Sequence, residues 1–160
     1  MRSFLDPIKP MLAVSAEPFS SPDYSYEIKW DGYRAIAFLD PRAGVRLQSR
    51  NLKPLLDKFP VLGELHRKVR RQVILDGEIV SFVAGRPSFS ALKKGEGKIS
   101  YLAFDLLYLD GEWLFEVPLW RRQEKLREIG QNLALSLPLA VDGLAAFQKA
   151  AELGLEGIMA

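Results

Sequence analysis

The sequence contains no cysteine, which excludes disulfide bonds, thiolate chemistry and zinc sites with cysteine ligands. No apolar run approaches the roughly 18 residues that cross a bilayer, and prolines and charges interrupt the N-terminal residues, unlike a signal peptide. The net charge is only +2, so any contact with nucleic acid must come from a local patch of cations. We therefore expect a protein of the reducing cytoplasm with no membrane segment.

The chain of 160 residues is long enough for one domain with a true hydrophobic core. Its hydrophobic fraction of 48% and charged fraction of 26% are those of an ordinary globular protein. Neither an internal repeat nor a low-complexity tract divides it. We expect a single domain over residues 1–160, with a proline-rich, extended entry over residues 1–23.

The first half of the chain predicts strands joined by tight turns. Aromatic and branched residues dominate residues 24–30, 34–39 and 44–49, and glycine-containing turns separate these segments. This pattern favours an antiparallel meander. Residues 53–71 instead carry apolar residues at helical spacing, so we expect a helix there that Pro60 interrupts.

The second half mixes strands and helices without strict alternation. The predicted elements are strands over residues 73–83, 99–109, 133–141 and 156–160, a loop with one helical turn over 84–98, and helices over 119–129 and 143–153. Asp142 is a suitable N-cap for the last helix. Recurrent hairpin turns favour an α+β fold with antiparallel β-sheets flanked by helices over a doubly wound parallel sheet.

The segment from Glu27 to Arg34, EIKWDGYR, gives the strongest indication of chemistry. It places Lys29 between two carboxylates and ends in an arginine, which suits a nucleophile that attacks phosphorus, because the arginine balances the charge that develops there. The alternative is a surface hairpin, since Asp31-Gly32 is a good two-residue turn. On a strand, however, Glu27, Lys29 and Asp31 share one face, where three charges crowd together unless a ligand organises them.

This segment resembles the first motif of the covalent nucleotidyltransferases, which include ATP-dependent DNA ligases, RNA ligases and mRNA capping enzymes. Further segments resemble the later motifs, in order and at plausible spacing over nearly the whole chain. They are LQSRN at residues 47–51, LDGEIV at 75–80, YLAFDLLYLDG at 101–111 and LEGIMA at 155–160. The segment PMLA at residues 10–13, together with the segments GRPSF and AFDLLYLDG, is most similar to the corresponding segments of the bacterial ATP-dependent DNA ligases of non-homologous end joining.

The resemblance implies an adenylation domain of the ATP-grasp-like DNA ligase type, lacking the OB-fold domain, in which Lys29 attacks the α-phosphorus of ATP. It also implies roles for seven other residues. The backbone around Glu27 and Ile28 reads the adenine edge, Arg34 and Arg50 lie near the ribose and phosphates, Phe104 stacks on the adenine, Glu78 contacts the ribose or a metal, and Glu156 helps to hold that metal, Mg²⁺ or Mn²⁺. These pairings of side chain and ligand are chemically reasonable.

Each implied role has a structural alternative. Phe104 could be plain core, Arg50 a surface cation, Glu156 a solvated strand end, and Asp76-Gly77-Glu78 a bulge with an exposed acid. Three clusters of cations could be either solvated surface or contacts to the phosphates of nicked DNA. They lie within residues 67–71, 93–98 and 121–127.

Related enzymes continue into a fifth motif, with lysines near the α-phosphate, and into an OB-fold domain, whereas this sequence ends at Ala160. We therefore expect a piece of a longer protein. Residues 1–160 alone should bind nucleotide, adenylylate themselves slowly or not at all, and seal no nicks.

The favoured interpretation is the catalytic core of a bacterial end-joining DNA ligase. It implies nicked or broken double-stranded DNA as substrate, end-joining proteins as partners and a cytoplasmic, nucleoid-associated location. An RNA ligase or a capping-type nucleotidyltransferase is the nearest alternative, because it uses the same lysine chemistry. A non-catalytic module that binds nucleotide or DNA is the alternative from another class.

Overall fold

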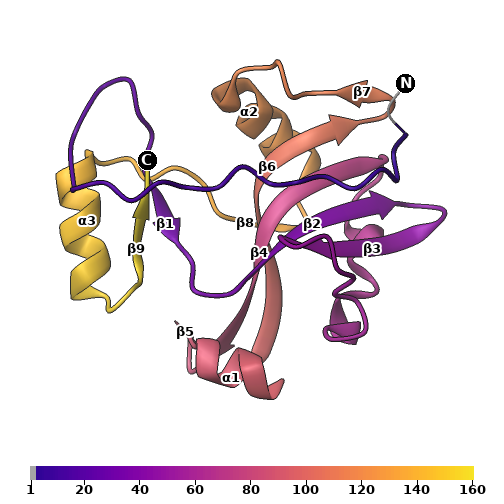
Figure 1. The fold of residues 1–160 in the computed structure, drawn as a ribbon, viewed down its shortest axis with the longest axis horizontal. Helices are drawn as coiled ribbons and strands as arrows, with labels where there is room; N and C mark the ends of the chain where they lie inside the picture. The colour runs from indigo at the N-terminus through magenta and orange to yellow at the C-terminus, as the bar shows by residue number, and fades with distance from the viewer. Residues whose placement is uncertain (1–2) are drawn as a thin grey trace.

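A curved sheet of seven strands dominates residues 3–160, which are the residues that this computed structural model describes (Figure 1). Its strands are β2 (Tyr33–Asp40), β3 (Gly44–Ser49), β4 (Val73–Val83), β5 (Arg86–Pro87), β6 (Lys98–Leu109), β7 (Glu112–Trp113) and β8 (Ala134–Leu135). The order is β3-β2-β4-β6-β7, with β5 paired to β4 and β8 paired to β6. Every ladder of this main sheet is antiparallel except β6–β8, which confirms the predicted α+β class.

A second, small sheet pairs β1 (Glu27–Lys29) with β9 (Gly157–Met159) in antiparallel register. The helices are α1 (Phe89–Lys94), α2 (Leu119–Ile129) and α3 (Gly143–Glu152). In Figure 1, α3 lies beside the small sheet, whereas α1 and α2 lie at the ends of the long strands of the main sheet. Asp142 caps α3 by accepting hydrogen bonds from the amides of Leu144 and Ala145, as predicted.

The main sheet buries apolar side chains on both faces. One face meets α1, α2 and the segment between β3 and β4, with Leu75, Leu106 and Leu126 fully enclosed. The other face is covered by the N-terminal segment, which runs across the sheet toward α3 (Figure 1). Gln48 of β3 holds that segment, because its side-chain amide exchanges two hydrogen bonds with the backbone of Ile8.

Three predicted elements are wrong. Residues 53–71 form no α-helix but two short 3₁₀-helices, Pro60–Leu62 and Leu65–Lys68. The strand predicted over residues 24–30 shortens to β1 and pairs with β9, so it is not part of a meander with β2. The strand predicted over residues 133–141 is reduced to β8.

Candidate active site

Lys29 lies at the end of β1, where the small sheet brings it against Glu156. The register pairs Lys29 with Gly157, so the residue before β9 lies beside the lysine. The Lys29 ammonium and the Glu156 carboxylate form an ion pair, and each side chain is 40% exposed. The two residues are 127 positions apart in the sequence, and both were candidates from the sequence.

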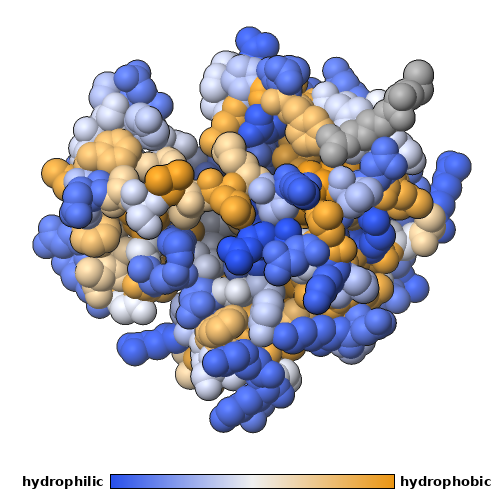
Figure 2. All heavy atoms as spheres, in the orientation of Figure 1, coloured by the Kyte–Doolittle hydropathy of each residue, from blue (hydrophilic) through white to orange (hydrophobic). Residues whose placement is uncertain are grey.

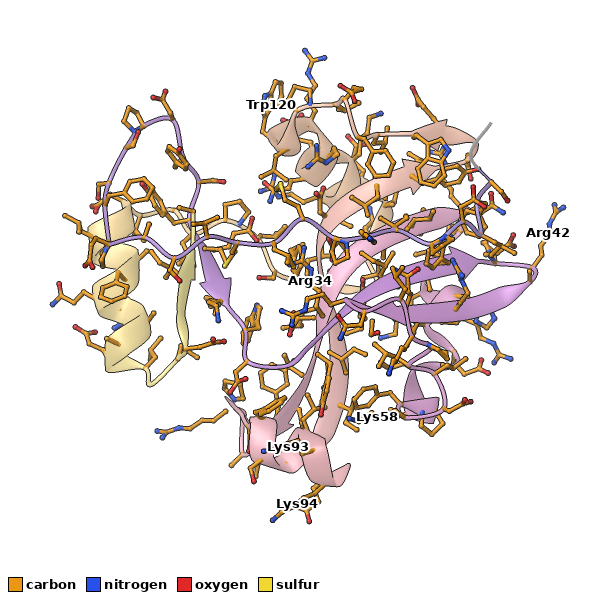
Figure 3. The ribbon with its side chains drawn as sticks, viewed as in Figure 1. Arg34, Arg42, Lys58, Lys93, Lys94 and Trp120 are labelled. Atoms are coloured by element: carbon orange, nitrogen blue, oxygen red, sulfur yellow. The ribbon has the colours of Figure 1, made fainter. Side chains whose placement is uncertain are left out.

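Arg34 of β2 lies where the main sheet meets the small sheet, at the centre of Figure 3. Its guanidinium forms a bidentate ion pair with Asp76 of β4, at 2.6 Å and 2.7 Å, and lies 4.8 Å from the centroid of the Phe104 ring. Burial disfavours the charged guanidinium, but the hydrogen bonds and charge of Asp76, together with the charge of Glu78, raise the pKa of Arg34. The arginine is therefore a fixed cation with an aromatic ring beside it.

Asp76 is only 5% exposed, and burial raises the pKa of its carboxyl, while the two hydrogen bonds from Arg34 act in the opposite direction. Beyond Asp76, the buried hydroxyl of Tyr101 donates to the carbonyl oxygens of Ala35 and Leu75. The β4–β6 register shifts between Asp76 and Gly77, so the bulge that was the structural alternative for Asp76-Gly77-Glu78 is present. Asp76 is buried and Glu78 is partly buried, so neither is the exposed acid of that alternative.

Glu78 lies opposite Arg34 in the β2–β4 register. Burial raises the pKa of its carboxyl from 4.5 to about 7. The charges of Arg34 and Lys29 lower this pKa, and those of Asp76 and Asp31 raise it. The two glutamates predicted to hold a metal, Glu78 and Glu156, thus both interact electrostatically with Lys29.

Phe104 is not part of either hydrophobic core cluster and is partly exposed beside Arg34. Its ring is therefore not enclosed in a core, as the plain core alternative requires, and the Arg34 guanidinium lies over it. Ile28 is the central residue of β1, opposite Ile158. Arg50 lies in the exposed turn after β3, and within residues 3–160 no interaction links it to Lys29 or Arg34.

Glu27 faces α2, where its carboxylate accepts a hydrogen bond of 2.7 Å from the side chain of Gln123. Burial raises the pKa of Glu27, the Gln123 hydrogen bond lowers it, and the charge of Asp105 raises it. Asp105 is itself held by Arg122 of α2 through two hydrogen bonds of 2.8 Å. Helix α2 thus positions the strand that carries the lysine.

Sequence reasoning assigned no role to Asp76, Gln123 or Trp30. Gln123 was detectable as a polar residue between the apolar positions of α2, and it is 3% exposed. Trp30 follows Lys29 directly, and its indole donates a 2.9 Å hydrogen bond to Ser136 while its ring contacts Phe82 edge-on. Trp30 therefore fixes the short connection between the small sheet and the main sheet.

Among the residues that the structure describes, no group of three or more histidine or acidic side chains could enclose a metal ion. The pair Glu78 and Glu156 nevertheless fits a hard cation such as Mg²⁺. This ion keeps several waters and is usually bound by one or two carboxylates together with substrate phosphates. The donor chemistry fits the predicted metal, although an all-protein cage is absent from residues 3–160.

Comparison with known proteins shows the family. Residues 10–160 match the ATP-dependent DNA ligase domain. The multifunctional non-homologous end joining protein LigD of Mycobacterium bovis is 34% identical over 97% of this chain and 21% of its own length. LigD of Pseudomonas aeruginosa is 35% identical over 95% of this chain and 19% of its own length.

The same relationship is visible in three dimensions. A solved structure of mycobacterial DNA ligase D, complexed with ATP and MES, superposes with a TM-score of 0.85 at 32% identity. The match covers 93% of this chain and 52% of the solved chain. The chain belongs to the family of ATP-dependent DNA ligase domains. It spans about a fifth of the LigD proteins that it matches, and none of its described helices is long and apolar enough to cross a membrane.

Proposed function

We propose that this domain forms a covalent lysyl-AMP at Lys29, as the first step of DNA sealing by an ATP-dependent ligase. The neutral Nζ attacks the α-phosphorus of ATP, a P–N bond forms, and the bond to the bridging oxygen breaks as pyrophosphate leaves with the electron pair. Before attack the ammonium must lose a proton, and Glu156 is the carboxylate in direct contact with it.

The observation that supports this proposal most directly is the position of Lys29 between acidic and basic groups. Nζ forms an ion pair with Glu156, and its charge lowers the pKa of the nearby Glu78 carboxyl. Asp76 fixes the guanidinium of Arg34 beside Phe104. Phosphoryl transfer depends mainly on positioning and charge neutralisation, and this arrangement provides a nucleophile, a fixed cation and an aromatic face.

We assign the remaining roles from the motifs. Phe104 stacks on the adenine, the backbone at Glu27 and Ile28 reads its edge, and Arg34 and Arg50 contact the ribose and phosphates. Glu78 and Glu156 would hold Mg²⁺ or Mn²⁺, which when bound would neutralise phosphate charge.

The later steps concern the whole protein. The adenylate passes to a 5′-phosphate of nicked or broken double-stranded DNA, and attack by the 3′-hydroxyl seals the strand and releases AMP. The names of the relatives support end joining as the process and end-joining proteins as partners. We propose a cytoplasmic, nucleoid-associated protein in which residues 1–160 are one part of the catalytic core.

The test is the intact mass of the protein after long incubation with ATP, Mg²⁺ and pyrophosphatase, which removes the leaving group. The wild-type protein should gain the mass of one AMP, and peptide mapping should place it on Lys29. Lys29→Ala should gain nothing. Lys149→Ala is the matched control, because it also removes one lysine from an exposed ion pair, with Glu152, and should still be labelled.

Labelling of Lys29→Ala, or attachment of AMP to another residue of the wild-type protein, would contradict this proposal. A parallel incubation with GTP separates it from a capping-type enzyme, since label from GTP alone excludes the ligase assignment.

A further inference from the structure

Gln123 joins helix α2 to the strand that carries Lys29. Its side-chain amide donates a hydrogen bond of 2.7 Å to one carboxylate oxygen of Glu27, Oε1. An ionised carboxylate only accepts, so the atom of Gln123 in this contact is the amide nitrogen. Within residues 3–160 the second oxygen of Glu27, Oε2, accepts no hydrogen bond and forms no ion pair. One oxygen of Glu27 is therefore fixed, and the other keeps its capacity to accept.

The packing of α2 holds Gln123 in place. The residue is only 3% exposed. Leu126, one turn further along α2, belongs to the same core cluster as Leu106 of β6. The neighbouring Arg122 ties the helix to β6 through two hydrogen bonds of 2.8 Å to Asp105. A buried amide on a fixed helix has little freedom to turn, so it sets the direction of the carboxylate that it contacts.

The carboxylate that Gln123 holds borders the candidate site. Strand alternation places Glu27 and Lys29 on the same face of β1. Asp105 directly follows Phe104, and its charge acts on the carboxyls of both Glu27 and Asp76, so it lies close to both. The Glu27 carboxylate therefore shares a strand face with the nucleophile and borders the segment of β6 that carries the ring.

We propose that Gln123 is a positioning residue that makes the site selective for a 6-aminopurine. By holding Oε1 of Glu27, it leaves Oε2 to accept a hydrogen bond from the 6-amino group of adenine. This inference rests on the proposed function, because a base stacked on Phe104 then presents its edge to β1. A 6-oxopurine has an acceptor at the same position, so the fixed carboxylate repels it. The selectivity thus depends on a residue of α2 that does not itself touch the nucleotide.

The direction of the Gln123 amide has a distinctive consequence for Glu27→Gln. The substitution keeps the size of the side chain, and the Gln123 nitrogen still requires an acceptor. The oxygen of the substituted amide therefore takes the position of Oε1, and its NH₂ group takes the position of Oε2. A donor now faces the base, so this variant should favour a 6-oxopurine, and the change in preference should require Gln123.

The test is the affinity for three triphosphates, measured by calorimetry without a divalent cation so that no chemistry follows binding. ATP, purine riboside triphosphate and ITP carry an amino group, a hydrogen and an oxygen at position 6 of the purine. The wild-type protein should bind ATP at least about 10-fold more tightly than purine riboside triphosphate, the effect of one hydrogen bond to a charged group. Gln123→Leu should reduce this ratio to less than about 3-fold.

Glu27→Gln should shift the preference from ATP toward ITP by at least about 10-fold relative to the wild-type protein. Adding Gln123→Leu should abolish that shift, because the substituted amide is then free to turn. Gln131→Leu is the matched control: it makes the same substitution at an exposed position shortly after α2, and its ratios should equal those of the wild-type protein. Glu27→Gln preserves the hydrogen bond to Gln123, so it tests the proposal even if Gln123→Leu does not fold.

An unchanged ratio of ATP to purine riboside triphosphate in Gln123→Leu overturns the inference, as does a Glu27→Gln variant that keeps the wild-type preference. A wild-type protein that binds these two nucleotides equally, or binds neither, overturns it as well. The site of AMP attachment in the wild-type protein tests the proposed function separately. Attachment at Lys29 with unaltered base preference in both variants overturns this inference alone, whereas attachment to another residue refutes the proposed function.

Discussion

Glu78 is placed where folding and function favour opposite charge states. Burial among the strands favours the neutral acid and raises the pKa of its carboxyl to about 7. The proposed contact to a metal or a ribose hydroxyl favours the carboxylate. The nearby cations Arg34 and Lys29 oppose the effect of burial only in part, so ionisation of Glu78 should cost stability in the absence of ligands.

The sign of this cost predicts a stabilising substitution. The folded state holds the proton more tightly than the unfolded chain, so the free energy of unfolding falls as the pH rises from 4.5 to about 7. Glu78→Gln removes that titration. It should be more stable than wild type by about 1 to 3 kcal/mol above pH 7, and the difference should vanish below pH 4.5.

The measurement is denaturant unfolding of both proteins at a series of pH values. Glu124→Gln, which removes an exposed carboxyl of α2, controls for the loss of one charge. A difference that does not change with pH, or a variant that is less stable at high pH, would show that Glu78 is not destabilising when ionised.

Most residues that meet at the candidate site could be predicted from the sequence. The residues that support them could not. Lys29, Arg34, Glu78, Phe104 and Glu156 belong to recognisable motifs, and the structure brings them to one region. Supporting contacts depend on three-dimensional pairing that no local pattern contains. The hydrogen bond between Gln123 and Glu27, for example, joins residues 96 positions apart.

Strand β4 illustrates how a glycine permits close packing inside an element. A Cβ atom at Gly77 would lie 2.5 Å from the carbonyl oxygen of Leu102 and 2.6 Å from the ring of Tyr101. Neither neighbour can move easily, because one is backbone of β6 and the other is a fully buried ring with two hydrogen bonds. Gly77 is therefore required by contacts between strands and not by its own backbone conformation.

Gly77→Ala should destabilise the protein by about 1 to 3 kcal/mol, the usual cost of overpacking a core. The comparison is Gly85→Ala in the β4–β5 turn, where φ is +78° and no atom lies within 4 Å of the added Cβ. There the cost is backbone strain alone, about 1 to 2 kcal/mol. Unfolding by denaturant gives both values, and near-UV circular dichroism should change only for Gly77→Ala, because only that substitution disturbs Tyr101. An unchanged spectrum for Gly77→Ala would contradict this account.

The elements predicted wrongly share a physical cause. In residues 53–71 the apolar positions were recognised correctly, since Leu55, Phe59, Leu62, Leu65 and Val69 are all buried. The backbone between them is not helical throughout. Pro60 lacks an amide hydrogen and its ring opposes a helix that continues from the preceding residues, so a short 3₁₀-helix begins at Pro60 and a second follows at Leu65. Similarly, Pro138 interrupts the strand predicted over residues 133–141.

The partner of β1 could not be predicted for a different reason. Strand β1 has three residues, and its partner β9 lies at the other end of the sequence. The alternation of polar and apolar residues within so short a strand does not specify which other strand it pairs with. The Asp31-Gly32 turn therefore suggested a hairpin, whereas it connects two separate sheets.

The molecule as a whole divides into a large body and a small lobe, and the candidate site lies between them. The lobe holds α3, β1 and β9, and Figure 2 shows a notch at the upper edge of this face between it and the body. All six residues of the small sheet are only partly buried, whereas most of β4 is fully buried. Lys29 belongs to the lobe and Arg34 to the body, so a bound nucleotide would contact both.

This division predicts unequal hydrogen exchange. Amides of β1 and β9 should exchange faster than those at the centre of β4 and β6, because short, partly buried strands open without global unfolding.

ATP without a divalent cation, which allows binding without chemistry, should slow exchange in β1 and β9. At roughly 100 times Kd the stabilisation is about 2.7 kcal/mol, which slows exchange up to about 100-fold. The central amides of β4 and β6 provide the internal control. Equal protection of β1 and β4 without nucleotide, or no response of β1 and β9 to ATP, would mean that the lobe is not an independently opening part of the site.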